Sequence, residues 1–266
     1  MEIVYKVIKD GKIEGIIVRH TNMYATVLKS DITKYNYNNA TITSDLKIKS
    51  KSGKYIPEVD TKNVLKLYHG SKFGLTRIDV NGCARASDFG KGFYTNNSKE
   101  NAEELIARFQ SGKMYSFLLV TDNLNVYRFK NQRLWGYFIS YNRGELGLED
   151  IPKEYRDSIV DISTNYDVIV GAIADDSMSD AYRMYSTGLI SDLELFNCIV
   201  CLGLGQQFLV RTEKALRNLL LLDSYTMSED IRKLRLSSLA NKRLMLSSKL
   251  KDLMRRKGIK YNGKNK

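Results

Sequence analysis

The chain has little proline, cysteine, histidine and tryptophan. Its 266 residues include 2 prolines, 3 cysteines, 2 histidines and 1 tryptophan. So few prolines leave helices and strands largely uninterrupted. The three cysteines cannot complete an even disulfide framework, and Cys198 and Cys201 lie in an apolar run without a second pair of ligands. We therefore expect these cysteines to be buried thiols rather than a zinc or redox site.

Several functional signals are also missing. No apolar run approaches the roughly 20 residues needed to span a bilayer, and Met1–Tyr5 lacks the basic and apolar regions of a signal peptide. We expect no membrane partner and a cytoplasmic location, with delivery into a target cell as the alternative. The sequence shows no Ser-His-Asp arrangement, Walker-type loop or metal cluster, which gives little support to a hydrolase triad, a kinase or a metalloenzyme.

The positive charge is concentrated near the C-terminus. Residues 211–266 contain 16 Lys and Arg against 5 Asp and Glu, whereas residues 1–210 contain 26 against 25. Such asymmetry is typical of a chain that binds a polyanion such as RNA or DNA, or an acidic protein that masks the segment. A solvated helix followed by a frayed tail is the alternative interpretation.

The pattern predicts three parts: a small β domain over residues 1–61, a main domain over 62–225, and a basic helical extension with a tail over 226–266. In the first part, strands at Val4–Lys9 and Ile13–Val18 flank an Asp-Gly turn, which predicts a hairpin. A segment this short is marginal alone, so we expect it to pack on the main domain.

The main domain mixes short strands with short helices. Ser98 is the expected N-cap of the first helix. The expected strands are 64–69, 114–120, 124–129, 166–174 and 207–210, and the expected helices are 102–109, 132–143, 179–186 and 191–201. Because there is no regular βαβ repeat, this order predicts an α+β core of two packed sheets.

A long helix is expected after Ser228. One apolar face is formed by five leucines at helical spacing, while Lys and Arg fill the other faces. These leucines are Leu236, Leu239, Leu246, Leu250 and Leu253. The face is expected to dock on the main domain; gripping an inhibitor helix or lying along a nucleic-acid backbone are the alternatives.

Two short runs predict a binding cleft. Leu67–Ser71 places His69 at the end of a strand beside a flexible turn, and Asp88–Thr95 surrounds an aromatic segment with glycines, which suit close approach of backbone to a ligand. A histidine at a strand end is by itself more often a hydrogen-bonded structural residue. Its combination with Tyr94 and a later Gln207 favours a functional role.

Together these runs resemble a family of bacterial domains in the ADP-ribosyltransferase superfamily. Relatives in that superfamily include diphtheria toxin and the poly(ADP-ribose) polymerases, in which a His, a Tyr and a later Glu or Gln line an NAD cleft. The similarity continues through 135–143, 166–176 and 207–216, and covers roughly residues 64–222. It implies a split-sheet core of the ADP-ribosyltransferase type.

The resemblance also implies NAD as a substrate, with no metal. Cleavage of the bond between nicotinamide and ribose creates an oxocarbenium-like centre, so the main task of the protein is to hold NAD and polarise the bond that breaks. By resemblance, His69 binds a ribose hydroxyl, Tyr94 stacks on the nicotinamide, and Gln207 accepts a hydrogen bond from a hydroxyl. The implied NAD-binding residues are His69, Gly70, Ser71, Asp88, Lys91, Phe93, Tyr94, Asp175 and Asp176.

A glutamine at position 207 departs from the glutamate of many relatives. Successive strand residues face opposite ways, so only one of Gln206 and Gln207 can face the cleft. A glutamine offers no full negative charge to the cation, and loss of such an interaction commonly costs about 2.7–4 kcal/mol. Asp88, Asp175 and Asp176 are the candidate helping carboxylates, and a single transfer fits better than polymer synthesis.

The leading hypothesis is a bacterial or phage toxin-like mono-ADP-ribosyltransferase. The basic C-terminal quarter favours RNA or DNA as the acceptor, with protein as the alternative, and a cognate inhibitor protein is a further possible partner. An NAD glycohydrolase and a non-catalytic nucleic-acid-binding module are the competing hypotheses. Lys91 could meet a pyrophosphate or lie in a solvated loop, and the Asp175-Asp176 pair could cap a helix instead of binding substrate.

Overall fold

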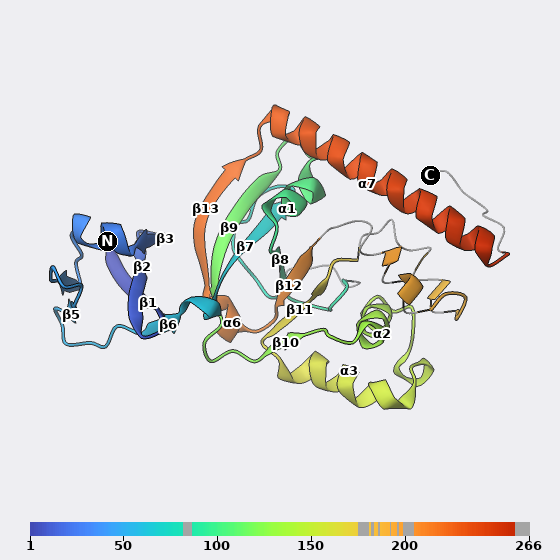
Figure 1. Cartoon of the computed structure of the whole chain (residues 1–266), viewed down its shortest axis with the longest axis horizontal. Coiled ribbons are helices and arrows are strands. Elements are labelled where there is room, and N and C mark those ends of the chain that lie inside the picture. The colour runs from blue at the N-terminus through green and yellow to red at the C-terminus, as the bar shows by residue number, and fades with distance from the viewer. Residues whose placement is uncertain are drawn as a thin grey trace.

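The computed structural model describes residues 1–81, 87–174, 181, 184–185, 187–191, 193–195, 197–198 and 205–258. Asp175 and Asp176, which were predicted to bind substrate, lie outside the described residues, as do Cys83 and Cys201. The fold is a mixed α+β arrangement of sheets and helices (Figure 1). None of the described helices is long and apolar enough to cross a membrane.

The described strands form three sheets. A four-stranded sheet has the order β3-β2-β1-β6, a seven-stranded sheet has the order β10-β11-β12-β8-β7-β9-β13, and β4 pairs with β5. The strands are β1 (Glu2–Lys9), β2 (Lys12–His20), β3 (Met23–Leu28), β4 (Ala40–Ile42), β5 (Ile48–Ser50), β6 (Glu58–Asp60), β7 (Val64–Ser71), β8 (Phe93–Asn96), β9 (Lys113–Val120), β10 (Val126–Arg128), β11 (Val168–Ala172), β12 (Gln206–Val210) and β13 (Leu219–Thr226). The described helices are α1 (Lys99–Ile106), α2 (Gln132–Asn142), α3 (Lys153–Asn165), α6 (Glu213–Arg217) and α7 (Glu229–Arg256).

The four-stranded sheet starts with the predicted hairpin. Asp10 and Gly11 both have positive φ, at 50° and 72°, which suits a two-residue turn whose twist matches that of the flanking strands. The sheet then packs on the outer face of β9 and β13, where Ile17 and Val59 join the apolar cluster of Leu118 and Leu220. The N-terminal strands therefore cover apolar surface of the larger sheet.

The seven-stranded sheet separates into two groups of strands. Strand β8 pairs with β12 at four positions, from Gln207↔Asn96 to Val210↔Phe93. With β7, however, β8 pairs only at Tyr68↔Asn96, whereas β7 continues along β9 over its whole length. The two groups, β10-β11-β12-β8 and β7-β9-β13, therefore share one backbone-paired position.

The first helix, α1, covers the sheet beside this junction. The Ser98 side chain accepts from the Asn101 backbone N–H, so the predicted N-cap is confirmed. The helix lies so close to β7 that a Cβ at Gly70 would come within 2.7 Å of the Ala102 carbonyl oxygen. Helix packing therefore requires a glycine at Gly70, which was predicted to bind NAD.

The predicted long helix is α7, which runs across the molecule from the α1 side (Figure 1). Its second half buries Leu246, Leu250 and Leu253 in the main core. The prediction of one continuous leucine face is wrong in the first half, where Leu236 is 39 % exposed. There the contact with α1 is polar instead, because the inward positions hold charged residues that meet acidic groups on α1.

Two buried glutamates of α1 make that polar contact. Glu103 accepts from Arg235 Nε at 2.7 Å and from the Tyr225 hydroxyl at 2.6 Å. Glu104 accepts from Lys242 Nζ at 2.7 Å. The two carboxylates are buried, whereas the Arg235 and Lys242 side chains are partly exposed; a buried carboxylate without its cation would be costly, so these pairs help to orient the helix. They hold α7 in one register on α1.

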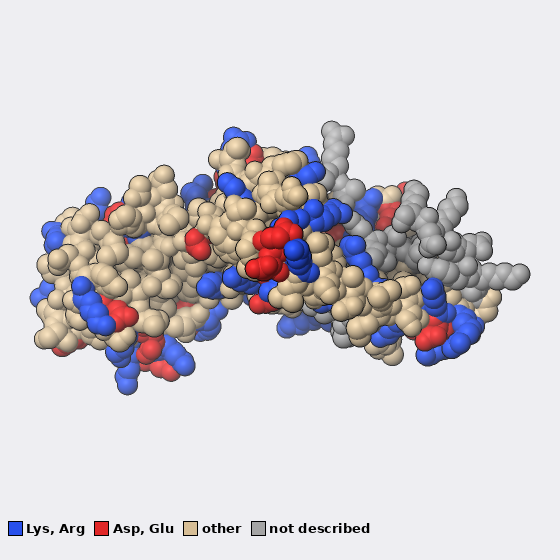
Figure 2. Space-filling model, turned by 90° about the horizontal axis from the view of Figure 1, so that it is seen from above, with Lys and Arg blue, Asp and Glu red and all other residues tan. Residues whose placement is uncertain are grey.

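Much of the basic excess of residues 211–266 is matched by acidic or carbonyl groups within the chain. At least eight of its 16 Lys and Arg have such partners. They are Arg211, Lys214, Arg232, Lys233, Arg235, Lys242, Arg255 and Lys257. The view onto the α7 side shows blue side chains in separate groups rather than one continuous patch (Figure 2). At least half of these cations therefore already have partners within the chain, some of them within α7 itself.

Candidate functional site

His69 lies in a pocket at the end of β7. The pocket has a volume of about 410 Å³, a size typical of small-molecule sites. Its wall comes from the end of β7, the loop that follows it, and the start of β8. The lining residues are His69, Gly70, Ser71, Lys72, Leu75, Arg77, Asp79, Gly92, Phe93 and Tyr94.

The imidazole of His69 is fixed by two contacts. Its Nδ1 lies 2.7 Å from the Tyr94 carbonyl oxygen, and because a carbonyl only accepts, Nδ1 carries the proton and Nε2 is left as an acceptor. Its ring centroid lies 4.5 Å from that of Phe93. Burial lowers the pKa of His69 below its ordinary value, against the smaller opposing effect of the Tyr94 hydrogen bond. The ring is therefore neutral at neutral pH.

Tyr94 is tied to the turn that precedes its strand. Its hydroxyl donates to the Gly90 carbonyl oxygen at 2.7 Å and accepts from the Phe89 N–H at 2.9 Å. Gly90 has φ +86°, and a Cβ there would also meet the Asn142 side chain at 2.8 Å, so only glycine fits. The phenol thus braces the turn while Tyr94 also lines the His69 pocket.

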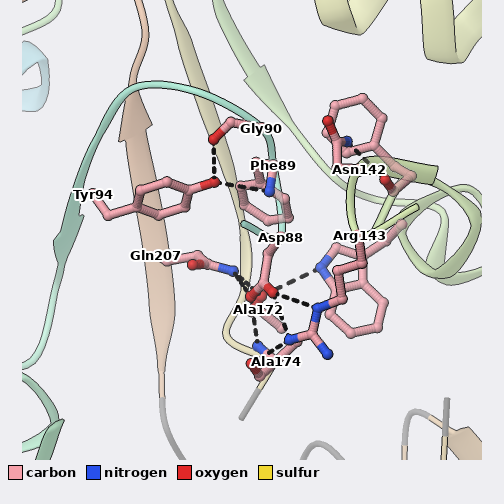
Figure 3. Close-up of polar contacts among 11 residues, drawn as sticks. Asp88, Phe89, Gly90, Tyr94, Asn142, Arg143, Ala172, Ala174 and Gln207 are labelled. Atoms are coloured by element: carbon pink, nitrogen blue, oxygen red, sulfur yellow. Dashed lines mark hydrogen bonds and ion pairs between the residues drawn. The ribbon is translucent and has the colours of Figure 1, made fainter. Parts of the chain in front are cut away.

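Gln207 belongs to a buried polar network. Its Nε2 donates to Asp88 Oδ2 at 2.7 Å and to the Ala172 carbonyl oxygen at 3.2 Å. Since both partners only accept, the amide orientation is fixed. Asp88 Oδ1 in turn accepts from Arg143 Nε at 2.9 Å and Nη2 at 2.6 Å. Figure 3 shows these groups converging on the Asp88 carboxylate, with the oxygen of Gln207 on the side away from it.

This network also holds the end of β11. The Ala174 N–H donates to Asp88 Oδ2 at 3.3 Å, and Arg143 Nη2 donates to the Ala174 carbonyl oxygen at 3.0 Å. Among the residues that the structure describes, none donates a hydrogen bond to Gln207 Oε1. The network therefore presents one fixed acceptor atom.

The three predicted catalytic side chains do not line one pocket. The register places Tyr68, Asn96 and Gln207 on one face of the sheet, and His69, one residue further, faces the other side with Phe93. Gln207 is 7 % exposed and is not part of the His69 pocket wall. Tyr94 shares the Gln207 face, diagonally across from it on the neighbouring strand.

In this register the side chains of Gln206 and Gln207 face opposite sides of the sheet. Gln207 faces Asp88, whereas Gln206 is exposed on the other face of β12. Of the candidate carboxylates, the structure places Asp88 beside Gln207, but its charge is paired with Arg143. No local pattern predicts a role for Arg143 in the site, because its partner Asp88 lies 55 residues earlier in the chain.

A second pocket adjoins the first. Its volume is about 340 Å³, and it is lined by Val80, Asn81, Phe89, Gly90, Lys91, Asn142, Ser163, Arg211 and Thr212. Both pockets use the same two segments, because residues 77–79 and 92–94 line the first while 80–81 and 89–91 line the second. Lys91 is exposed at the wall of the second pocket. The predicted binding residues Lys91 and His69 therefore lie in neighbouring pockets.

Residues 65–221 match the sequence model of a family described as "Protein of unknown function (DUF3990)". This match covers more than half of the chain. The chain belongs to this family. No curated protein and no solved structure matches it.

The DUF3990 match has boundaries that are informative about the site. It includes all described residues of both pockets and the whole Gln207–Asp88–Arg143 network. The four-stranded N-terminal sheet and α7 lie outside it. The two pockets and the network are therefore built entirely within the part of the chain that matches the family.

Proposed function

We propose that this protein is a toxin-like mono-ADP-ribosyltransferase that transfers ADP-ribose from NAD to a macromolecule, on a core of the ADP-ribosyltransferase type. The observation that carries the proposal is the pair of adjoining pockets, with His69 and Tyr94 in one and Lys91 in the other. A dinucleotide has two halves joined by a pyrophosphate. Two neighbouring pockets, one of which has a lysine in its wall, suit such a ligand.

The reaction in this proposal replaces one bond at the ribose. The bond between C1′ and the nicotinamide nitrogen breaks, and its electron pair leaves with nicotinamide. A nucleophilic oxygen or nitrogen of the acceptor then bonds to C1′ and loses its proton to solvent. His69 Nε2, as an acceptor, would bind a ribose hydroxyl, and the Tyr94 ring would stack on nicotinamide.

Gln207 would act from the face of the sheet that it shares with Tyr94, opposite His69 and outside the His69 pocket, where its carbonyl oxygen would accept from a hydroxyl of the reacting ribose while His69 holds another part of the ligand. Its partners Asp88 and Ala172 hold the amide nitrogen, so the oxygen needs no reorientation when charge develops. Asp88 itself is neutralised by Arg143 and contributes no free carboxylate. With Asp88 paired, none of the candidate carboxylates that the structure describes is free beside the cation, which supports one slow transfer rather than chain synthesis.

Labelled NAD tests the proposal. The protein is incubated with NAD labelled in the adenosine half and a cell lysate, and the products are digested separately with nuclease and protease. We expect label on one class of macromolecule, and its loss by at least about 100-fold in His69→Ala and Tyr94→Ala. His20→Ala, which changes the only other histidine and an exposed one, should behave as wild type.

Other results would select the competing functions. Release of nicotinamide without labelled macromolecule would identify an NAD glycohydrolase. Unchanged NAD in every sample, with binding of nucleic acid retained by His69→Ala, would identify a non-catalytic binding module. If transfer is found, a toxin role predicts that expression arrests growth and that a separate inhibitor protein relieves the arrest.

A further inference from the structure

The loop after β7 presents an exposed ring beside a cation. Phe73 is 77 % exposed, although it directly follows Lys72 of the His69 pocket wall. Lys72 Nζ lies 4.6 Å from the centroid of the Phe73 ring. A large exposed aromatic side chain lowers solubility, so its position at the rim of a pocket indicates an interaction surface.

A second ring and a second cation extend this arrangement. The same Lys72 Nζ lies 4.8 Å from the centroid of the Phe109 ring. Arg108 Cζ also lies 4.8 Å from that centroid. The Ser111 hydroxyl donates to the Lys72 carbonyl oxygen at 3.2 Å, which ties the β7 loop to the segment after α1. We name Lys72, Phe73, Arg108 and Phe109 the aromatic rim.

The cations of the aromatic rim are not neutralised. Neither Lys72 nor Arg108 forms an ion pair with a carboxylate in the part of the chain that the structure describes. This differs from residues 211–266, where at least eight cations have partners within the chain. The available positive charge near the pocket therefore lies on the rim rather than on the inner side of α7.

We propose that the aromatic rim binds a single-stranded nucleic acid and presents it to the His69 pocket, so that the acceptor of the proposed transfer is single-stranded RNA or DNA. The inference rests on the proposed function for its acceptor role. Phe73 is exposed and Phe109 is half-buried; rings flanked by unpaired cations suit single strands, since bases stack on the rings and phosphates meet the cations. A duplex would not offer unstacked bases that could stack on the rings.

Binding can be measured without NAD, which separates this inference from the proposed function. Fluorescence anisotropy with labelled 20-nucleotide single-stranded RNA, single-stranded DNA and duplex DNA should show preference for one or both single strands. Phe73→Ala should weaken that binding by at least about fivefold. Tyr55→Ala is the matched control, because Tyr55 is 75 % exposed and lies 5.7 Å from Lys6 Nζ, far from the pocket; its binding should not change.

The salt dependence of binding tests the role of the cations. The double variant Lys72→Ala/Arg108→Ala should reduce the slope of log K against log salt by about 0.7 for each lost phosphate contact. Lys249→Ala/Arg256→Ala on α7 should leave the slope unchanged. With NAD present, Phe73→Ala should lose labelled nucleic acid while its slow cleavage of NAD without acceptor stays at the wild-type rate.

Four results would overturn the inference. The first is equal affinity of Phe73→Ala and wild type for single strands, and the second is a salt slope that falls with the α7 variant instead. The third is label that survives nuclease and is removed by protease. Binding to anionic phospholipid vesicles that is lost in Phe73→Ala, without binding to either single strand, would likewise reassign the rim to a membrane surface.

Discussion

A neutral histidine is the residue-scale feature on which the pocket depends. The pKa of His69 is lowered by burial from the ordinary 6.5, so the unfolded chain takes up a proton at a higher pH than the folded protein does. Above that ordinary value both states are neutral and His69 adds no pH dependence. As the pH falls from about 7 towards the folded pKa, protonation of the unfolded state removes stability.

We therefore expect wild type to lose more stability than His69→Gln between pH 7.5 and pH 5.5. Urea unfolding at each pH gives the measurement, because the difference between the two proteins isolates this one group from the others that titrate. Equal losses would mean that the imidazole is as easily protonated in the folded protein as in the unfolded chain.

The buried Asp88–Arg143 pair gives a second residue-scale prediction. Arg143→Gln leaves the Asp88 carboxylate buried without its cation, which should lower the free energy of unfolding by about 3–5 kcal/mol. Adding Asp88→Asn should recover part of this loss, because the unpaired charge is then gone. A double variant no more stable than Arg143→Gln would show that Arg143 acts through its contact with Ala174 instead. Urea midpoints provide the comparison.

What the sequence could predict at this scale depended on distance along the chain. The Ser98 cap was predictable because it involves only residues within one turn. Asp88 could be proposed as a carboxylate near Gln207 only through a family resemblance, since the two are 119 residues apart. The opposite facing of His69 and Gln207 depends on how β7 and β8 pair, and no local pattern contains that register.

At the scale of elements, α7 is held at its start by charge and at its end by leucines. Glu103 is 1 % exposed and accepts from both Arg235 and Tyr225. Glu103→Ala should therefore lower the free energy of unfolding by about 3–5 kcal/mol and expose the first half of α7 to trypsin. Asp31→Ala, which removes an exposed pair with Lys34, is the control and should change stability by less than about 0.5 kcal/mol. Resistance of Glu103→Ala to trypsin would show that the leucines alone dock α7.

Among the elements that were not predicted, α3 and β13 differ in the reason. Helix α3 carries a usable signal, since Tyr155, Ile159 and Ile162 are spaced along one face after Pro152. Strand β13 begins with four leucines, and a short apolar run of that kind does not distinguish a strand from a helix. Its pairing with β9 decides the matter, and that contact is long-range.

At the scale of the whole molecule, the N-terminal sheet covers part of the core that lies within the DUF3990 match. Leu118, Val120 and Leu220 are buried against it. A chain limited to residues 62–266 should expose these side chains and associate, which size-exclusion chromatography with light scattering would detect as a larger mass than that of the full chain. The substitutions Leu118→Thr and Leu220→Thr in the shortened chain should reduce the association. A shortened chain with the same state of association and urea midpoint as the full chain would contradict this role.

The single pair Tyr68↔Asn96 has a mechanical consequence. Of the neighbouring strands in the seven-stranded sheet, β7 and β8 share the fewest paired residues, and the His69 pocket lies directly beyond that pair. Separating the sheet there disrupts less backbone bonding than separating it anywhere else. The sheet thus has its least backbone bonding along a line beside the histidine pocket, and the His69 side chain, which contacts Tyr94 and Phe93, is one of the groups that join the two sides.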